Sequence, residues 1–249
     1  MTKKVLLAGE SWETFSVHIK GFDTFYTSKY EEGAEWLISA LENNGFEVDY
    51  LPNHRANSKF PTELNELKQY SAIILSDIGA NTLLLHPDTF EKSIPKPNRL
   101  KLIREYVKNG GGFLMVGGYI SFQGIEAKSN FKGTPIEEIL PVIMEKNDDR
   151  VEVPEGFNPK QTKEHSILDE VESSWPMLLG YNKFKAKDNA EVLVKHEDDP
   201  IVVIGDYHKG RTAAFASDCA PHWGSPEFVE WKDYDEFWSK LVKWITKEI

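Results

Sequence analysis

Cysteine is almost absent from this sequence, because the 249 residues include only Cys219. A single cysteine excludes an internal disulfide and a cysteine-rich metal site. Positive charge is also scarce, since 29 Lys and Arg residues stand against 40 Asp and Glu residues and give a formal net charge of −11. This balance disfavours binding to nucleic acid and to anionic membrane surfaces, and we expect neither as a partner.

Long hydrophobic runs are missing as well. No stretch approaches the roughly 18 apolar residues that a membrane-spanning helix needs. The run near the start, 5–8, is shorter than the hydrophobic region of a signal peptide. We therefore expect a cytoplasmic protein. The length suits one α/β domain, and no linker, internal repeat or low-complexity segment interrupts it, so we expect 1–249 to form a single domain.

Strand and helix patterns alternate through the first half of the chain. Unbroken apolar runs are typical of strands covered on both faces, and apolar residues on one helical stripe predict helices. This alternation predicts a mainly parallel sheet with right-handed crossovers. The expected strands are 5–8, 46–51, 71–76 and 113–116, and the expected helices are 30–44, 97–108 and a short one near Pro61, with a polar, aromatic loop before residue 30.

The pattern changes after residue 118. Residues 119–190 are rich in Pro, Gly, Asp and Glu, and we expect an irregular, insertion-like middle segment with one short helix at 134–140. The apolar runs 191–195 and 201–205 flank a turn and predict a β-hairpin. A further strand at 211–217 and an amphipathic helix at 234–249 close the chain.

Four stretches carry a resemblance to a known family: "GGGFLMVGGYISFQG", "TPIEEILPV", "DDRVEVPEG" and "FASDCAPHWG". In this order they resemble the class I glutamine amidotransferase-like superfamily, and more narrowly the bacterial putative glutamine amidotransferase family. The last stretch is also similar to trehalose-utilisation-like proteins. The resemblance covers essentially the whole chain and implies a flavodoxin-like α/β three-layer sandwich with a mainly parallel sheet.

The resemblance also implies a catalytic cysteine at the sharp turn after the fourth strand, here called the elbow, with a histidine followed by a glutamate after the last strand. In this sequence Tyr119 matches the elbow, and a phenol with an ordinary pKa of about 10 is a poor substitute for a thiolate. His222 matches the histidine but lacks the following His-x-Glu pattern, and Cys219 lies away from the elbow. We expect no glutaminase activity by the standard mechanism.

Ligands of open parallel sheets bind beyond the carboxyl ends of the strands. Four such ends carry acids, amides, hydroxyls and aromatic rings, which suit a small polar ligand of carbohydrate or amide type. Tyr119, His222 and Asp218 are the candidate catalytic residues, and Ser121 is an alternative nucleophile. The candidate ligand-binding residues are Glu10, Ser11, Trp12, Asp77, Asn81, Gly117, Gly118, Ser121 and Trp223.

Structural explanations compete with each of these assignments. Asp, Ser and Asn cap helices, Gly permits tight turns, and a lone cysteine is often a small buried hydrophobe. Asp77, Asp218 and His222 could meet Glu10 or His18 around a metal ion, but no ligand spacing supports a site, so we assign no metal and no cofactor. Arg150 is most simply explained by a local ion pair with Asp149 or Glu152.

Two classes of function remain open from the sequence. The first is an enzyme that acts on a small metabolite through Tyr119, His222 and Asp218. The second is a catalytically silent binding or assembly module that kept the sheet and lost the nucleophile, and it leaves homo-oligomerisation open. Convergence of Tyr119, His222 and an acid on one cleft distinguishes the first class from the second.

Overall fold

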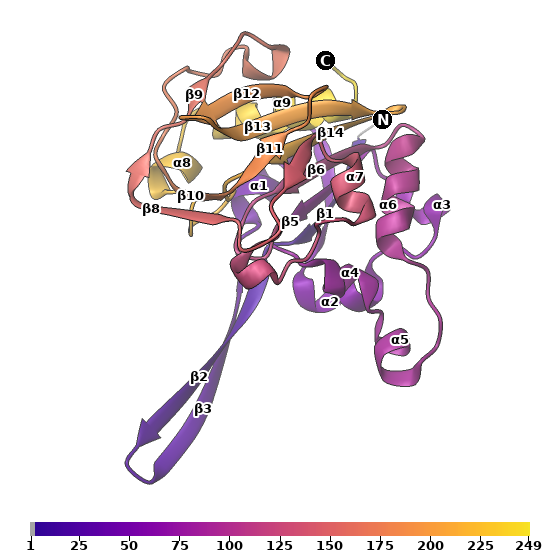
Figure 1. The fold of residues 1–249 in the computed structure, drawn as a ribbon, viewed down its shortest axis with the longest axis vertical. Coiled ribbons are helices and arrows are strands. Elements are labelled where there is room, and N and C mark those ends of the chain that lie inside the picture. The colour runs from indigo at the N-terminus through magenta and orange to yellow at the C-terminus, as the bar shows by residue number, and fades with distance from the viewer. Residues whose placement is uncertain (1–2) are drawn as a thin grey trace.

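An eight-stranded sheet forms the centre of the computed structural model, which describes residues 3–249 (Figure 1). Five strands are parallel in the order β4-β1-β5-β6-β14, which is the flavodoxin-like order, and an antiparallel extension β13-β12-β9 follows. Leu6 pairs with Ile73, so the expected parallel pairing of the first and third predicted strands is confirmed. The sheet strands are β1 Lys3–Gly9, β4 Phe46–Leu51, β5 Ala72–Ser76, β6 Gly112–Val116, β9 Lys160–Gln161, β12 Glu191–His196, β13 Asp199–Tyr207 and β14 Gly210–Phe215.

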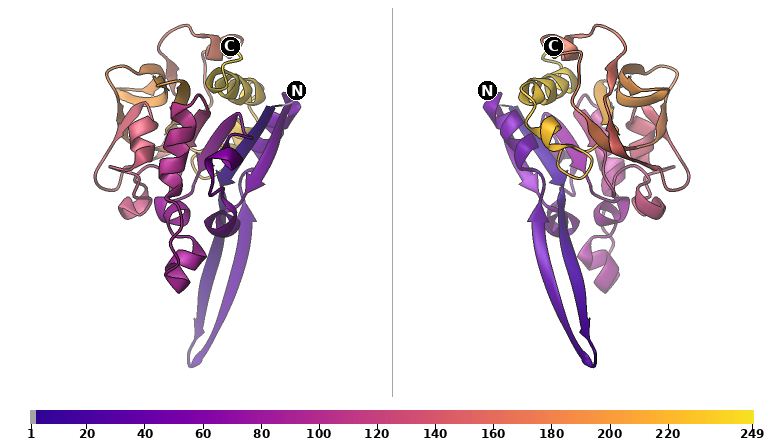
Figure 2. Two further views of the ribbon diagram at one scale, coloured as in Figure 1. Left: turned by 90° about the vertical axis from the view of Figure 1, so that its right-hand side faces the viewer. Right: turned by 90° about the vertical axis from the view of Figure 1, so that its left-hand side faces the viewer.

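Helices cover both faces of this sheet, which makes the protein a flavodoxin-like α/β sandwich (Figure 2). Helix α1 packs with α9 on one face, and α6 packs with α3, α4 and α7 on the other. Helix α9 places Phe237, Trp238 and Leu241 in the core, as its apolar stripe predicts. The helices are α1 Glu35–Asn43, α2 Asn53–Lys59, α3 Leu64–Leu67, α4 Ala80–Leu84, α5 Pro87–Lys92, α6 Arg99–Lys108, α7 Pro135–Ile139, α8 Pro226–Val229 and α9 Tyr234–Ile245.

The expected loop before residue 30 is wrong. Residues 11–32 form a β-hairpin of β2 Ser11–Lys20 and β3 Asp23–Glu32, which pair with each other in register and with no other strand. The hairpin stands out from the body of the molecule, and we call it the arm (Figures 1 and 2). Helix α1 consequently begins at Glu35 instead of residue 30, because Tyr30 and its neighbours still belong to β3. Helices α2, α4, α5 and α8 also have no counterpart among the expected helices.

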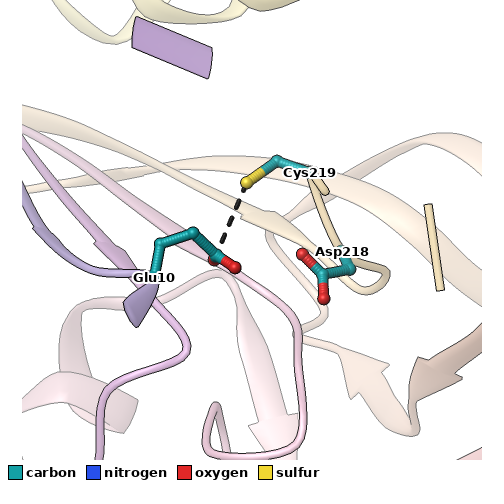
Figure 3. A group of neighbouring side chains, drawn as sticks. All are labelled: Glu10, Asp218 and Cys219. Atoms are coloured by element: carbon teal, nitrogen blue, oxygen red, sulfur yellow. Dashed lines mark hydrogen bonds between the residues drawn. The ribbon is translucent and has the colours of Figure 1, made fainter. Parts of the chain in front are cut away.

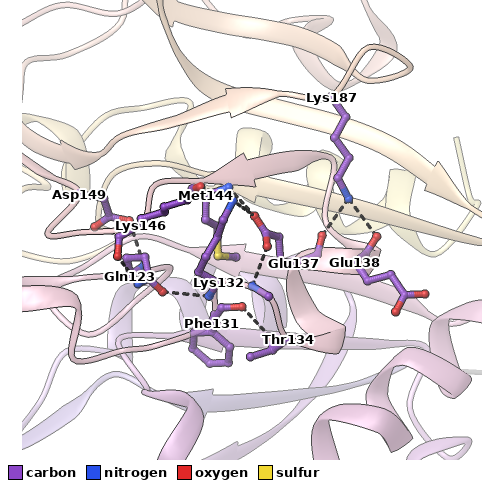
Figure 4. A network of polar contacts seen from close by, with 11 residues as sticks. Gln123, Phe131, Lys132, Thr134, Glu137, Glu138, Met144, Lys146, Asp149 and Lys187 are labelled. Carbon is purple, nitrogen blue, oxygen red and sulfur yellow. Dashed lines mark hydrogen bonds and ion pairs between the residues drawn. The ribbon is translucent and has the colours of Figure 1, made fainter.

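The middle segment is more regular than its composition predicts. The expected helix at 134–140 is present as α7, and five short strands surround it. Lys132 donates hydrogen bonds to Glu137 and to the backbone carbonyl of Met144, and Glu137 also accepts from the Met144 backbone (Figure 4). These polar contacts tie the segment to α7 in addition to its buried apolar side chains, such as Ile136 and Val142. The five strands are β7 Val142–Met144, β8 Arg150–Phe157, β9, β10 Leu178–Asn182 and β11 Phe184–Ala186.

Most other expected boundaries agree with the structure to within a few residues. The hairpin predicted around 197–200 is present as β12 and β13, and helix α6 begins two residues later than expected, at a cap in which Asn98 accepts a hydrogen bond from the Lys101 backbone. Helix α9 ends at Ile245 rather than at residue 249. Within residues 3–249, no helix is both long enough and apolar enough to cross a membrane.

Candidate functional site at the carboxyl edge of the sheet

Four parallel strands end at one edge of the sheet, here called the carboxyl edge, and the residues that follow them form the candidate site. Glu10 follows β1 and Asp77 follows β5, and both have left-handed backbones, with φ of 49° and 44°. Such conformations are strained for residues other than glycine and occur often at functional sites. The Glu10 backbone is held there by three hydrogen bonds: its N–H donates to Ser76, and its carbonyl accepts from Gly33 and from the Tyr50 hydroxyl.

Buried acids from two strand ends meet beneath the surface of this edge. Glu10 and Asp218 are both almost fully buried, and their carboxylates point toward each other beside Cys219 (Figure 3). Burial, followed by the nearby charge of Asp77, raises the pKa of Glu10 from its ordinary 4.5 to about 8. Burial, followed by the charges of Glu10 and Asp77, also raises the pKa of Asp218 well above its usual range. The cluster therefore holds protons at neutral pH.

Cys219 belongs to this cluster as a neutral thiol. Its Sγ lies 3.8 Å from Glu10 Oε2 and 3.6 Å from Ser76 Oγ, and Ser76 donates a 2.5 Å hydrogen bond to the same Glu10 oxygen. Burial and the two neighbouring acids raise the pKa of the Cys219 thiol. Because the thiolate is the nucleophile of cysteine enzymes, this thiol is unsuited to attack a substrate. The structure supports the structural role over the catalytic one.

Aromatic rings form the outer layer of the site. The His222 ring lies 5.0 Å from Trp12 and 6.0 Å from Tyr119, and Tyr119 lies 5.3 Å from Trp223, measured between ring centroids. His222 is exposed, Tyr119 and Trp12 are partly buried, and Trp223 is buried. His222 Nδ1 is 3.9 Å from Asp218 Oδ2, which links the exposed ring to the acids below. Tyr119, His222 and Asp218 thus lie close to one another at the carboxyl edge.

Two residues of β8 contribute to the site in a way that sequence reasoning missed. The Arg150 guanidinium lies over the Tyr119 ring at 5.2 Å, in cation–π geometry, and also binds Asp148 through two hydrogen bonds. Glu152 accepts a 3.0 Å hydrogen bond from the Trp223 indole. The local ion pair expected for Arg150 is present with Glu152, one of its two expected partners, and Asp148 takes the place of Asp149 as the other. The sequence carries no signal that places β8 beside the elbow.

A buried polar network holds the elbow itself. The backbone N–H of Gly118 donates to Asn182 Oδ1, and Asn182 Nδ2 donates to Asp149 Oδ1. Gly118 has φ of +149°, and a Cβ there would lie 2.8 Å from Asp77 Oδ1, so both conformation and space require glycine. Asp77 Oδ1 also accepts a 2.6 Å hydrogen bond from the Ile120 backbone, which joins the β5 and β6 ends. Burial raises the pKa of the Tyr119 phenol, so it stays protonated at neutral pH.

Several predicted ligand-binding residues have internal partners instead. Ser121 is buried, donates to the Val116 carbonyl and accepts from the Asp77 backbone, so its hydroxyl is occupied and unsuited to attack. Ser11 accepts from the Asn53 backbone and fixes the start of α2. Asn81 is exposed on α4 and lines a separate pocket of about 320 Å³. Gly117 is buried, and a Cβ there would meet the Ala216 carbonyl at 2.1 Å.

The buried acids raise the question of a metal ion. Among residues 3–249, Glu10, Asp218 and Cys219 are the group whose ligand atoms lie close enough, within 4.8 Å of one another. A cation would have to displace the protons that burial favours on all three groups. His18, considered from the sequence, lies on the arm, where it bonds Thr27 and stacks on Phe25. The Asp77 carboxylate accepts a hydrogen bond from the Ile120 backbone in the elbow loop. These observations favour a proton-sharing cluster.

The sheet has the flavodoxin-like strand order, polar and aromatic side chains line its carboxyl edge, and a sharp turn follows its central strand. These features place the protein in the amidotransferase-like class of α/β folds. The chain belongs to the family described as putative glutamine amidotransferase, whose model matches residues 4–247. The family assignment made from the four motifs is therefore confirmed.

Solved structures support the same conclusion. A cytoplasmic protein from Salmonella typhimurium is 48% identical, with 97% of this chain and 98% of that chain covered and a TM-score of 0.94. A second cytoplasmic protein, from Salmonella typhimurium LT2, is 50% identical over 97% and 99% of the two chains, also with a TM-score of 0.94. A ThuA-like protein from Bacteroides uniformis ATCC 8492 shares the fold at 14% identity, with 98% and 91% covered and a TM-score of 0.60. No curated protein matches the chain.

Proposed function

We propose that the carboxyl edge binds a small polar metabolite of carbohydrate or amide type and does not hydrolyse glutamine by the cysteine mechanism. The observation that carries this proposal is the convergence of Trp12, Tyr119 and His222 from three strand ends above the buried acids. Aromatic faces pack on sugar-like or planar ligands, and polar groups around them fix the orientation.

The chemistry available at this site is proton transfer and hydrogen bonding. The protonated phenol of Tyr119 is a hydrogen-bond donor to a ligand oxygen, and Arg150 above its ring adds positive charge. His222 is the exposed group that can exchange a proton with a ligand, and its Nδ1 lies 3.9 Å from Asp218 Oδ2, which connects it to the buried acids. A nucleophile with a low pKa is missing from the elbow, which argues against amide hydrolysis through a covalent intermediate.

A thermal-shift screen against monosaccharides, disaccharides and primary amides, including glutamine, tests the proposal. A ligand at 100 times its Kd stabilises the folded state by about 2.7 kcal/mol, which raises the Tm of a chain of this size by several degrees. The shift should become smaller in Tyr119→Phe and in His222→Asn, because each variant loses one hydrogen-bonding group. The control His208→Asn changes an exposed histidine in the turn between β13 and β14, at the opposite edge of the sheet, and should keep the shift.

Two results would count against the proposal. One is a screen in which no sugar or amide stabilises the protein. The other is a shift of equal size in wild type and in both site variants, which would place the ligand elsewhere. Turnover of the stabilising compound, followed by product analysis, separates an enzyme from the alternative, a non-catalytic binding module. Loss of turnover with retained binding in His222→Asn would mark His222 as the proton-transfer group.

A further inference from the structure

The arm, residues 11–32, has one apolar face and one polar face. Successive residues of a strand point to opposite sides, and the register pairs Phe15 with Ser28, Val17 with Tyr26 and Ile19 with Thr24. Phe15, Val17, Ile19 and Tyr26 therefore share one face, and the Phe15 and Tyr26 rings stack at 5.5 Å. The other face carries mostly polar side chains: Thr14, Ser16, His18, Lys20, Asp23, Thr27 and Lys29, with Phe25 among them.

No part of residues 3–249 covers the apolar face. Phe15 is 67% exposed, Ile19 72% and Tyr26 61%, and Phe22 at the tip is fully exposed. Seven of the twelve large hydrophobic side chains exposed among residues 3–249 lie on the arm. A two-stranded hairpin without further packing is only marginally stable in water. The arm would therefore be more stable if another surface packed on its apolar face.

A second apolar surface lies on the same side of the molecule. Leu85, Phe90 and Ile94, here called the α5 patch, are 42%, 75% and 46% exposed and account for three more of the twelve side chains. The arm and α5 both project from the body on the side of the carboxyl edge, apart from each other (Figure 1). The α5 patch borders the pocket of about 320 Å³ that Asn81 lines. One molecule thus carries both a projecting apolar ribbon and an apolar receiving surface.

We propose that the apolar face of the arm docks on the α5 patch of a second copy of this chain, and that the exchange is reciprocal. A two-fold arrangement covers both surfaces of both copies with a single kind of contact. The aromatic residues Phe15, Phe22 and Tyr26 and their aliphatic neighbours expose on the order of 500 Å² per arm. Two arms and the two smaller surfaces that receive them would bury on the order of 1,500 Å², which is within the range of specific, stable interfaces.

The arm also connects this interface to the candidate site. Its first strand begins at Ser11, and Trp12 contacts the His222 ring at 5.0 Å. Trp12 pairs across the arm with Glu31, so a partner that fixes the arm also fixes one wall of the site. The dimer is inferred from the exposed apolar surfaces alone and does not depend on the proposed ligand. The two proposals can therefore be tested separately.

The test measures the mass of the purified full chain by light scattering after size exclusion, over a series of concentrations. Wild type should have twice the mass of the 28.5 kDa chain. The arm variant Phe15→Thr/Val17→Thr/Ile19→Thr keeps residues that favour strands and should weaken dimerisation at least a hundredfold, because three apolar side chains per arm lose their cover. The patch variant Phe90→Ser should also give the monomer mass.

A matched control changes the polar face of the same arm: Thr14→Ser/Ser16→Thr/Thr27→Ser should retain the wild-type mass. Circular dichroism and Tm show that each variant is folded, since none of the changed side chains is in the core. A monomeric wild type at every concentration overturns the proposal, and so does an arm variant that keeps the wild-type mass. A dimeric Phe90→Ser beside a monomeric arm variant overturns the α5 patch as the receiving surface.

Discussion

Replacing Glu10 with glutamine tests whether the acids beneath the candidate site hold protons at neutral pH. Glutamine has the shape of the protonated acid and can still accept the hydrogen bond that Ser76 donates to Glu10 Oε2. It cannot ionise, so it removes the cost that the folded protein bears when a buried carboxyl loses its proton. We therefore expect Glu10→Gln to stabilise the protein at alkaline pH and to leave it nearly unchanged at acidic pH.

The magnitude follows from the pKa of Glu10, which is about 8 in the folded state against an ordinary 4.5. Between these values the folded state binds more protons than the unfolded state, so the free energy of unfolding falls as pH rises through this window. A shift of this size corresponds to at most about 5 kcal/mol. Asp218 and Asp77 shift in the same direction, and wild type should therefore be most stable toward the acidic end of the window.

Urea unfolding at pH 5, 6, 7 and 8 measures the effect. The advantage of Glu10→Gln over wild type should be below about 1 kcal/mol at pH 5 and reach several kcal/mol at pH 8. The control Glu164→Gln changes an exposed carboxyl and should follow the wild-type curve. A wild-type stability that rises from pH 5 to pH 8, or a variant with the same pH dependence as wild type, would refute the reasoning and show that Glu10 is ionised in the folded protein.

Three further predictions concern the elbow and its surroundings. Tyr119→Cys should release no ammonia from glutamine, because the His-x-Glu pattern is missing; turnover in a coupled ammonia assay would contradict this. Cys219 should react with a thiol reagent only on unfolding, since it is buried and its pKa is raised; fast labelling of the native protein would show an accessible thiolate. Gly118→Ala should lower stability by about 1–3 kcal/mol, from the strained φ and the contact with Asp77, and an unchanged Tm would show that the elbow adapts.

Local patterns predicted the elements of the sheet and the identity of the elbow residue. All side chains of an unbroken apolar run such as 72–75 are buried only when layers cover both faces of the strand. Local composition therefore predicts the parallel sandwich. The motifs around Tyr119 and His222 identified the family, which the family model confirms. The arm differs from the loop that its polarity predicts, although Phe15, Val17 and Ile19 alternate with polar residues in the period of two that is typical of a strand with one apolar face.

Only the tertiary structure decided what surrounds those residues. Glu10 and Cys219 are 209 residues apart in the sequence, and the parallel order of the strands brings them into contact and buries them, which is what raises their pKa values. Arg150 reaches Tyr119 because β8 folds back beside the elbow, a long-range contact without a local pattern. The exposure of the arm is likewise a tertiary property: alternation gives an apolar face, and only the arrangement of the whole chain shows that no part of residues 3–249 covers it.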